Sequence, residues 1–235
     1  MKVPFYGLKL PNSEQIILSE VESRHCIKVL RYKLGDKVKV LDGRGYLYSC
    51  IISDDNIKQC TLDIVNTDFK DRADCELHII IAPPKNLDRI DWLIEKSVEM
   101  GASKVSFVIS DRSIRNKIKI ERLERISIAA MKQSCSRYKL KIDNMVLLSD
   151  VFNQIDTVQR FIPHIDKGHR DLIYDVIMPK KDTCILIGPE GDFTPEEIKV
   201  ATDNNFQSVS LGDRRLRTET AAIMVIGVFN YVNGY

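Results

Sequence analysis

The pattern of apolar and polar positions changes at about residue 70. Before that point apolar residues recur at every second position, for example through residues 46–52, and this period is typical of half-buried strands. The Asp42-Gly43-Arg44-Gly45 segment has the residues of a hairpin turn. Ser19 is a candidate N-cap for one short helix that ends near Arg31. Several short strands around one helix predict a small β-barrel domain over residues 1–70.

After a polar linker at residues 68–74, strands alternate with helices. Gly101 follows the first of these helices and is a typical C′ stop. Alternation of this kind predicts a parallel sheet covered by helices on both faces, in a domain over residues 75–235. The pattern predicts strands over residues 77–82, 105–109, 145–148, 172–176, 184–187 and 209–211, and helices over residues 87–100, 118–135, 195–205 and 218–231.

Composition narrows the class of protein. The 235 residues are 44% hydrophobic and 29% charged, as in ordinary globular proteins. No apolar run approaches the roughly 20 residues that a membrane span needs, and no signal-peptide pattern opens the chain, so we expect a soluble, cytoplasmic protein without a membrane partner. The cysteines are scattered without a C-x-x-C pair, so we expect free thiols and no metal site; they are Cys26, Cys50, Cys60, Cys75, Cys135 and Cys184.

Positive charge is concentrated between residues 112 and 141. In this stretch ten Lys and Arg residues stand against two acids, Glu121 and Glu124. Such a surplus suits the phosphate backbone of RNA. A solvated helix face has the same composition, and the sequence leaves both interpretations open.

The first candidate site is the junction between the strand predicted at 184–187 and the helix after it. In parallel sheets ligands bind outside the carboxyl ends of the strands. Here Gly188-Pro189-Glu190-Gly191 precedes Thr194-Pro195 and Glu197, which have the pattern of a capping box with proline at the first helical position. The surrounding acids disfavour a phosphate, so we expect a neutral or cationic ligand. A tight turn before a capped helix is the purely structural alternative.

The second candidate site is the loop before the last predicted helix. Residues 211–221 read Leu-Gly-Asp-Arg-Arg-Leu-Arg-Thr-Glu-Thr-Ala, with three arginines directly before an apolar run. Guanidinium groups at the ends of strands can stabilise an anion or a developing enolate. An ordinary charged loop is the alternative.

Together the two junctions resemble the RsmE family of SPOUT methyltransferases. The resemblance rests on Gly188-Pro189-Glu190-Gly191, Leu211-Gly212 and Leu216-Arg217-Thr218-Glu219-Thr220-Ala221. It continues over nearly the whole chain, in the order of the family's motifs. The further matching residues are Lys85, Glu95-Lys96-Ser97, Glu99-Met100-Gly101, Arg112-Ser113 and Gln133-Ser134, and in the first half His25, Val29-Leu30-Arg31, Gly35-Asp36 and Asp42-Gly43.

The resemblance implies a fold and an activity. The fold is an α/β trefoil-knotted (SPOUT) parallel-sheet domain preceded by a small PUA-like β-barrel that binds RNA. The activity is methylation of N3 of a specific uridine in 16S ribosomal RNA of the small subunit, with S-adenosyl-L-methionine as cofactor, by a homodimer. By position, the cofactor would be bound by Tyr174, Ile187, Gly188, Pro189, Glu190, Gly191, Leu211, Gly212, Leu216, Thr220 and Ala221, and the RNA by His25, Arg31, Lys85, Arg112, Arg115 and Arg137.

Removal of the imide proton from N3 would spread negative charge onto the ring carbonyls. Arg217 is the candidate for stabilising that charge, because it lies between the cofactor loop and the last helix. Glu219 and Glu190 are candidate proton acceptors, although either could be purely structural. We expect Trp92 to belong to the core of the first helix, and His78, His164 and His169 to be structural.

The chain departs from the family pattern at Asp192, where a second glycine is usual, and at Arg215, where an aliphatic residue is usual. Ser136 and Leu140 also depart from the pattern, at the end of the basic stretch. Two alternatives therefore stay open. One is an RNA-binding SPOUT-like protein without catalysis, and the other is a SPOUT methyltransferase that acts on another rRNA or tRNA position, such as a ribose 2′-hydroxyl.

Overall fold

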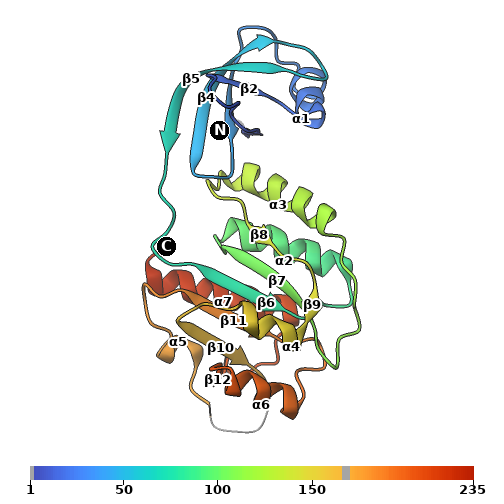
Figure 1. Cartoon of the computed structure of the whole chain (residues 1–235), viewed down its shortest axis with the longest axis vertical. Helices are drawn as coiled ribbons and strands as arrows, with labels where there is room; N and C mark the ends of the chain where they lie inside the picture. Colours follow the sequence, from blue (N-terminus) through green and yellow to red (C-terminus); the bar gives the residue numbers. More distant parts are fainter. Residues whose placement is uncertain (1–2, 166–169) are drawn as a thin grey trace. The chain divides into compact units, whose positions relative to one another are not determined.

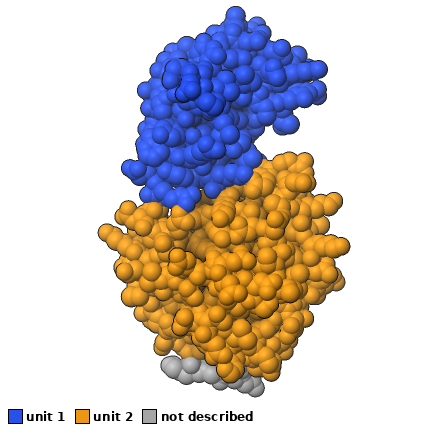
Figure 2. Space-filling view, in the orientation of Figure 1, with its two compact units in different colours: residues 1–72, 128–139 blue, residues 73–127, 140–235 orange. Residues whose placement is uncertain are grey.

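The computed structural model describes residues 3–165 and 170–235. The chain divides into two compact units (Figure 2), which are described separately: unit 1 is residues 1–72 with 128–139, and unit 2 is residues 73–127 with 140–235. The division near residue 72 falls inside the linker expected at 68–74. His169 lies outside the described residues. No described helix is long and apolar enough to cross a membrane.

Unit 1 is built on a five-stranded sheet in the order β1-β3-β4-β5-β2. Val38 and Val40 on β3 pair with Cys50 and Tyr48 on β4, and all four side chains are buried, which is the alternation expected from the sequence. Asp42 closes the predicted hairpin, since its Oδ1 accepts hydrogen bonds from the backbone N–H groups of Arg44 and Tyr46. The strands are β1 (Phe5–Tyr6), β2 (Gln15–Ile17), β3 (Lys37–Leu41), β4 (Tyr46–Asp54) and β5 (Thr61–Phe69).

The helix of unit 1 begins where the sequence predicts. Ser19 caps α1 (Glu20–Arg24), because its side chain accepts a hydrogen bond from the N–H of Glu22. The chain continues as one π-helical segment, His25–Val29.

Residues 128–139 belong to unit 1 although they are distant from it in sequence. Lys132 forms a 2.6 Å ion pair with the buried Glu22, and the N–H of Gly45 donates to the carbonyl of Arg137 at 2.9 Å. Arg137 also donates to the backbone carbonyl of Asp68 at 2.9 Å and pairs with its carboxylate. These tertiary contacts divide helix α3 (Ile120–Ser134) between the units, which a contiguous pair of domains (1–70 and 75–235) does not anticipate.

Unit 2 is a parallel α/β layer structure (Figure 1). Its strands run in the order β12-β10-β11-β6-β7-β8, with β9 also pairing β7, and every pair is parallel. All residues of the central β6 and β11 are buried, as expected of strands covered on both faces. The strands are β6 (Leu77–Ile81), β7 (Lys104–Ile109), β8 (Lys141–Ile142), β9 (Val146–Leu147), β10 (Gln159–Pro163), β11 (Thr183–Ile187) and β12 (Gln207–Val209).

The helices of unit 2 cover both faces of this sheet. On one face Ile80, Val108 and Leu186 pack into a core with Val151 of α4 and Ala201 of α6. α7 lies against β6, β11 and α2. The helices are α2 (Leu87–Glu99), α3 (Ile120–Ser134), α4 (Leu148–Val151), α5 (Ile173–Val176), α6 (Pro195–Asp203) and α7 (Thr218–Asn233), with a 3-10 turn at Phe152–Gln154.

Most predicted elements of unit 2 are confirmed, but one prediction is wrong, and the predictions omit β8, β10 and α4. Residues 173–176 form the short helix α5 instead of a strand. The strand β10 was not predicted, because it carries Gln159 and Arg160. Gln159 is buried by hydrogen bonds to Met178 and Thr183, and Arg160 donates to three carbonyl groups, so tertiary contacts satisfy polar groups that the pattern alone places outside a strand.

The six cysteines, all among the described residues, are free thiols, and five of them are buried. The trefoil knot implied by the resemblance stays a prediction.

Candidate functional site

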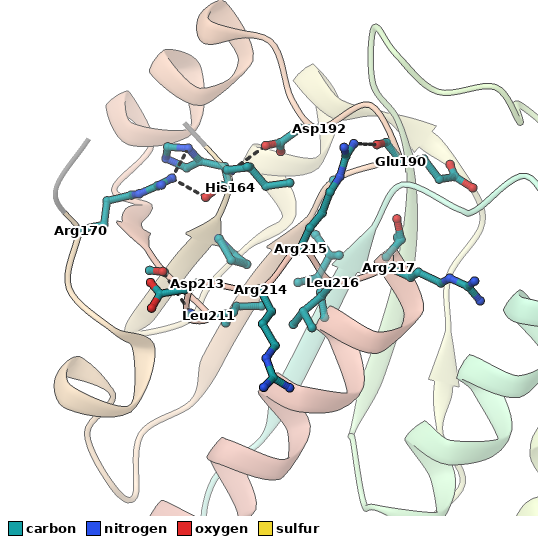
Figure 3. Close-up of a pocket in the computed structure, with 18 of the residues that line it drawn as sticks. His164, Arg170, Glu190, Asp192, Leu211, Asp213, Arg214, Arg215, Leu216 and Arg217 are labelled. Atoms are coloured by element: carbon teal, nitrogen blue, oxygen red, sulfur yellow. Dashed lines mark hydrogen bonds between the residues drawn. The ribbon is translucent and has the colours of Figure 1, made fainter. Parts of the chain in front are cut away.

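A cavity of about 770 Å³ lies at the carboxyl ends of β10, β11 and β12 (Figure 3). This is the edge at which ligands are expected in a parallel sheet. Three loops and the start of α7 line it: Pro163, His164, Ile165, Arg170 and Leu172 after β10; Ile187, Gly188, Pro189, Glu190 and Asp192 after β11; and Ser210 to Thr218 with Ala221 after β12.

The loop after β11 is held in a fixed shape. A Cβ atom on Gly188 would lie 3.2 Å from two ring carbons of the buried Phe193, so a side chain there would have to displace the ring. Asp192 has φ +61°, a conformation that favours glycine but that Asp adopts more readily than most residues. Its carboxylate accepts from the N–H of Phe193 at 2.8 Å and from the N–H of Ile165 at 2.7 Å. Asp192 therefore adopts a backbone conformation that glycine favours and adds a link to the loop after β10.

Glu190 is engaged within the protein. Its Oε1 accepts from the backbone N–H of Lys85 at 2.9 Å, which ties this loop to the one after β6. Its backbone carbonyl accepts from Arg215 at 3.4 Å, and Figure 3 shows Arg215 reaching across to it. These bonds favour the structural interpretation of Glu190.

Two arginines expected to bind RNA brace the same loops from outside the cavity. Arg112 donates to the carbonyls of Gly191 and Phe193 at 2.8 and 3.3 Å. Arg115 donates to the carbonyl of Lys85. The predicted capping box of α6 is formed, and Oε1 of its Glu197 also accepts from the N–H of Asp111.

The loop after β12 places its arginines in different directions. Gly212 has φ +103°, which requires glycine in practice. Figure 3 shows Arg214, Arg215 and Arg217 pointing away from one another, and Arg217 pointing away from the large cavity. Arg217 is the N-cap residue of α7, and its carbonyl accepts from the N–H of Ala221 at 2.8 Å.

A second, smaller pocket of about 330 Å³ lies between α2 and the first turn of α7. Arg217 lines both cavities. Glu219 is 6% exposed, and its Oε1 lies 3.5 Å from Nε of Arg89. Its Oε2 is buried and has no hydrogen-bond partner among the described residues. The pocket is lined by Asp88, Arg89, Trp92, Arg217, Glu219 and Thr220.

Trp92 is 42% exposed at this pocket, so the expectation that it belongs to the core is wrong. The helical spacing in the sequence indicates this exposure. The buried stripe of α2 is formed by Ile90, Leu93, Ile94 and Val98, and position 92 lies outside the spacing of that stripe.

The structure brings eight of the eleven residues predicted to bind the cofactor to the large cavity. Gly191 is adjacent and contributes its carbonyl to Arg112, and Thr220 lines the small pocket. Tyr174 is 51% exposed on α5 and is not among the lining residues. The eight are Ile187, Gly188, Pro189, Glu190, Leu211, Gly212, Leu216 and Ala221.

The loop after β10 supplies residues that sequence reasoning missed. His164 and Arg170 face each other there, with His164 Nδ1 2.7 Å from an Arg170 nitrogen. They were missed because β10 itself was not predicted, so no strand end marked this loop.

Several basic side chains between residues 112 and 141 form ion pairs with acidic residues. Arg122 pairs with Asp91, Lys132 with Glu22 and Arg137 with Asp68. Outside this stretch, His25 and Arg31 are exposed on unit 1, and Lys85 is exposed on unit 2. The uncommitted positive charge is therefore smaller than the composition indicates.

Two family models match the chain. Residues 71–230 match an RNA methyltransferase domain, and residues 18–65 match an RNA methyltransferase PUA domain.

Individual proteins match over nearly the whole length. The ribosomal RNA small subunit methyltransferase E of Aquifex aeolicus is 26% identical over 91% of this chain and 93% of that protein. A probable rRNA-methyltransferase from Porphyromonas gingivalis, known from its crystal structure, is 34% identical, with a TM-score of 0.91 and 99% of each chain covered. The ribosomal RNA small subunit methyltransferase E of Neisseria gonorrhoeae, crystallised with S-adenosyl methionine bound, is 25% identical, with a TM-score of 0.88 and 99% and 98% of the chains covered.

Proposed function

This chain belongs to the RsmE family of RNA methyltransferases, and from that membership we propose that it methylates N3 of a specific uridine in the 16S RNA of the small ribosomal subunit, using S-adenosyl-L-methionine. The observation that carries the proposal is the position of Arg217, which lines both the large cavity and the small pocket beside it. Arg217 thus lies at the boundary between the cavity that we assign to the cofactor and the pocket that we assign to the base.

The large cavity suits S-adenosylmethionine in size and lining. Its volume of about 770 Å³ is within the range of small-molecule sites, roughly 300–1,000 Å³. Backbone at Gly188 and Gly212 and apolar side chains at Leu211, Leu216 and Ala221 would hold the adenosine part. The other predicted cofactor contacts stay part of the proposal: Tyr174, Ile187, Pro189, Glu190, Gly191 and Thr220. Tyr174 would reach the cofactor only if α5 moves. When bound, this cofactor supplies an electrophilic methyl group.

Arg217 and Glu219 would then act on the acceptor base. Uracil N3 becomes nucleophilic when its N–H bond breaks and the proton passes to a base, which leaves the electron pair on nitrogen and spreads charge to the carbonyl oxygens. The unpartnered Oε2 of Glu219 is a suitable proton acceptor, and the guanidinium of Arg217 would stabilise the charge on the oxygens.

RNA contact is proposed for both units. His25 and Arg31 are exposed on unit 1, and Lys85 is exposed beside the cavity loops. Arg112, Arg115 and Arg137 keep a place in the proposal, with the added role of bracing loops. Phosphates attract such residues without regard to sequence, so these contacts would orient the RNA rather than select the uridine.

A homodimer is part of the proposal. α7 is apolar almost throughout, with Glu219 its only charged residue. Ile223, Met224 and Val228 remain partly exposed, and Tyr231 is 86% exposed. An apolar helix that keeps accessible side chains is typical of a surface that a partner covers, and a second copy of this chain is the partner that the family implies.

The test is calorimetric titration with S-adenosylhomocysteine, followed by mapping of the methyl group on small-subunit RNA. We expect one molecule bound per chain and a methylated base that stops reverse transcription, as N3-methyluridine does by blocking pairing. A folded protein that binds no S-adenosylhomocysteine would contradict the proposal and favour an RNA-binding role without catalysis. A product that leaves pairing intact would indicate a ribose methyl group instead.

A further inference from the structure

The small pocket between α2 and α7 has the features of a binding site of its own. It measures about 330 Å³ and is formed entirely within unit 2. It is separate from the large cavity but shares Arg217 with it. None of the cofactor contacts proposed above requires it, apart from Thr220.

Glu219 gives this pocket an unsatisfied hydrogen-bond acceptor. The residue is 94% buried, and while Oε1 faces Arg89, Oε2 has no partner among the residues that the structure describes. Buried polar atoms are nearly always hydrogen-bonded, and leaving one unpaired costs about 1–3 kcal/mol. Oε2 is closed off from solvent, so a ligand in the pocket would reach it, and remove that cost, once the Glu219 side chain rotates towards the pocket.

Trp92 gives the pocket a flat apolar surface. It is 42% exposed, although its neighbours Ile90 and Leu93 are fully buried on the opposite side of α2. An exposed indole beside two arginines, Arg89 and Arg217, is a typical platform for a nucleic-acid base, because rings stack on aromatic faces and guanidinium groups donate to carbonyl oxygens.

We propose that this pocket receives the acceptor base, that Trp92 stacks on it, and that Glu219 selects a base that presents an N–H group between two carbonyl groups. The inference rests on the proposed function and extends it by naming the residues that recognise the base. The pocket offers a buried acceptor at Glu219 and guanidinium donors at Arg89 and Arg217, and the carboxylate of Asp88 lies at its exposed edge. Uracil offers the complement: the N3–H donor lies between the O2 and O4 acceptors.

Cytosine would be rejected at the same atom. Its N3 carries a lone pair and no hydrogen, so it would face the carboxylate of Glu219 with two acceptors opposed. Pairing an acceptor with a donor and opposing two acceptors differ by about tenfold to a hundredfold in affinity at a buried site.

The experiment uses Trp92 as its own reporter, since it is the only tryptophan in the chain. The full-length protein is titrated with the pentaribonucleotides AAUAA and AACAA while tryptophan emission is recorded. We expect AAUAA to quench the emission and to bind at least about tenfold more tightly than AACAA. The Glu219→Gln variant should bring the two affinities close together, because its amide can donate to N3 of cytosine. Glu95→Gln, on α2 but outside the pocket, is the control for loss of a carboxylate and should keep the difference.

Two results would overturn the inference. One is equal quenching by both oligonucleotides, and the other is unchanged emission up to millimolar concentrations. Labelled AAUAA adds a second readout by anisotropy: Trp92→Leu should weaken its binding several-fold, whereas Trp92→Phe should retain most of it. Failure of the proposed function is seen separately, as loss of S-adenosylhomocysteine binding at the large cavity. If AAUAA quenches the emission selectively but the protein does not bind S-adenosylhomocysteine, the base-recognition site is supported and the proposed methyl transfer is contradicted.

Discussion

Two polar groups of unit 2, one around the buried His78 and one at the buried Glu219, differ in one respect. In the first, His78 Nε2 lies 2.8 Å from Ser106 Oγ, Ser106 donates to Asp143 at 2.8 Å, and Lys104 pairs with Asp143 at 2.7 Å. In the second, Glu219 is as buried as His78, but one of its oxygens has no hydrogen-bond partner among the described residues, and the residue lines a pocket. A His, a Ser and an Asp within hydrogen-bond distance look more like a catalytic group than a single glutamate does.

The comparison shows that the presence or absence of hydrogen-bond partners, more than burial or residue type, separates a structural cluster from a candidate site. Each member of the His78 cluster uses a neighbour that the fold supplies, and none of its members lines either of the two cavities described here. Such networks make one packing arrangement specific. An unpaired buried group costs stability, and it persists where a ligand can complete it.

The largest effect is expected beside Glu219. Arg217→Ala should lower the rate of methyl transfer by about 10²–10³-fold, because a fixed cation would no longer stabilise the charge on the base. The affinity for S-adenosylhomocysteine, measured by calorimetry, should change less than about threefold, since Arg217 points away from the large cavity. An unchanged rate would contradict the role of Arg217. Arg125→Ala, an exposed position on α3, controls for loss of positive charge.

Two substitutions, one in each polar group, test whether the first is structural and the second functional. His78→Ala should lower the free energy of unfolding by about 2–4 kcal/mol, because it leaves a cavity and removes a partner of Ser106, while the rate per folded molecule stays the same. Glu219→Gln should do the reverse: it should slow the reaction about a hundredfold and leave the free energy of unfolding within about 1 kcal/mol. Urea unfolding and single-turnover assays of both variants measure the four values. Loss of activity in folded His78→Ala protein would make that cluster functional.

Acid should destabilise the first cluster before it affects any carboxylate near it. Burial, reinforced by the charge of Lys104, lowers the pKa of His78 from 6.5 to about 3. Below pH 6.5 the unfolded chain therefore binds a proton that the folded chain does not, and the free energy of unfolding falls by about 1.4 kcal/mol per pH unit. The stability is present above pH 6.5 and is lost as pH falls towards 3.

The titration of Asp143 does not overlap with that of His78 in the upper part of this pH range. Burial raises its pKa, but the hydrogen bonds and charges of Lys104, Ser106 and Lys141 outweigh burial and place the pKa below its ordinary 3.8. Its effect on stability therefore begins only below about pH 4. Between pH 6.5 and 5 urea unfolding should show a decrease of about 2 kcal/mol, and His78→Gln should flatten the curve in that interval. A decrease of equal size in the variant would assign the titration to another group.

The sequence predicted the parts of the site that depend on local chemistry. The Thr194–Glu197 capping box, the glycines at 188 and 212 and the strands before these two loops, β11 and β12, are found as expected. The parts that depend on distant contacts were not predictable in the same way. β10 is a strand because Met178, Thr183 and other residues satisfy Gln159 and Arg160, and the small pocket exists because α2 lies against α7. The same holds for residues 128–139, whose place in unit 1 rests on partners such as Glu22.

The smallest effect, on a backbone position, distinguishes structure from function in the same way. A Cβ atom at Gly188 would lie 3.2 Å from the ring of Phe193, whereas one at Gly191 would make an ordinary 3.4 Å contact with Arg112. Gly188→Ala should therefore lower the free energy of unfolding by about 1 kcal/mol and, because the loop after β11 lines the large cavity, reduce the affinity for S-adenosylhomocysteine about tenfold. Gly191→Ala should leave the free energy of unfolding nearly unchanged, so it is the matched control for the effect on packing. If Gly188→Ala lowers stability but leaves the affinity for S-adenosylhomocysteine unchanged, this glycine is needed only for the packing of Phe193. The loop after β11 would then be structural, as the His78 cluster is.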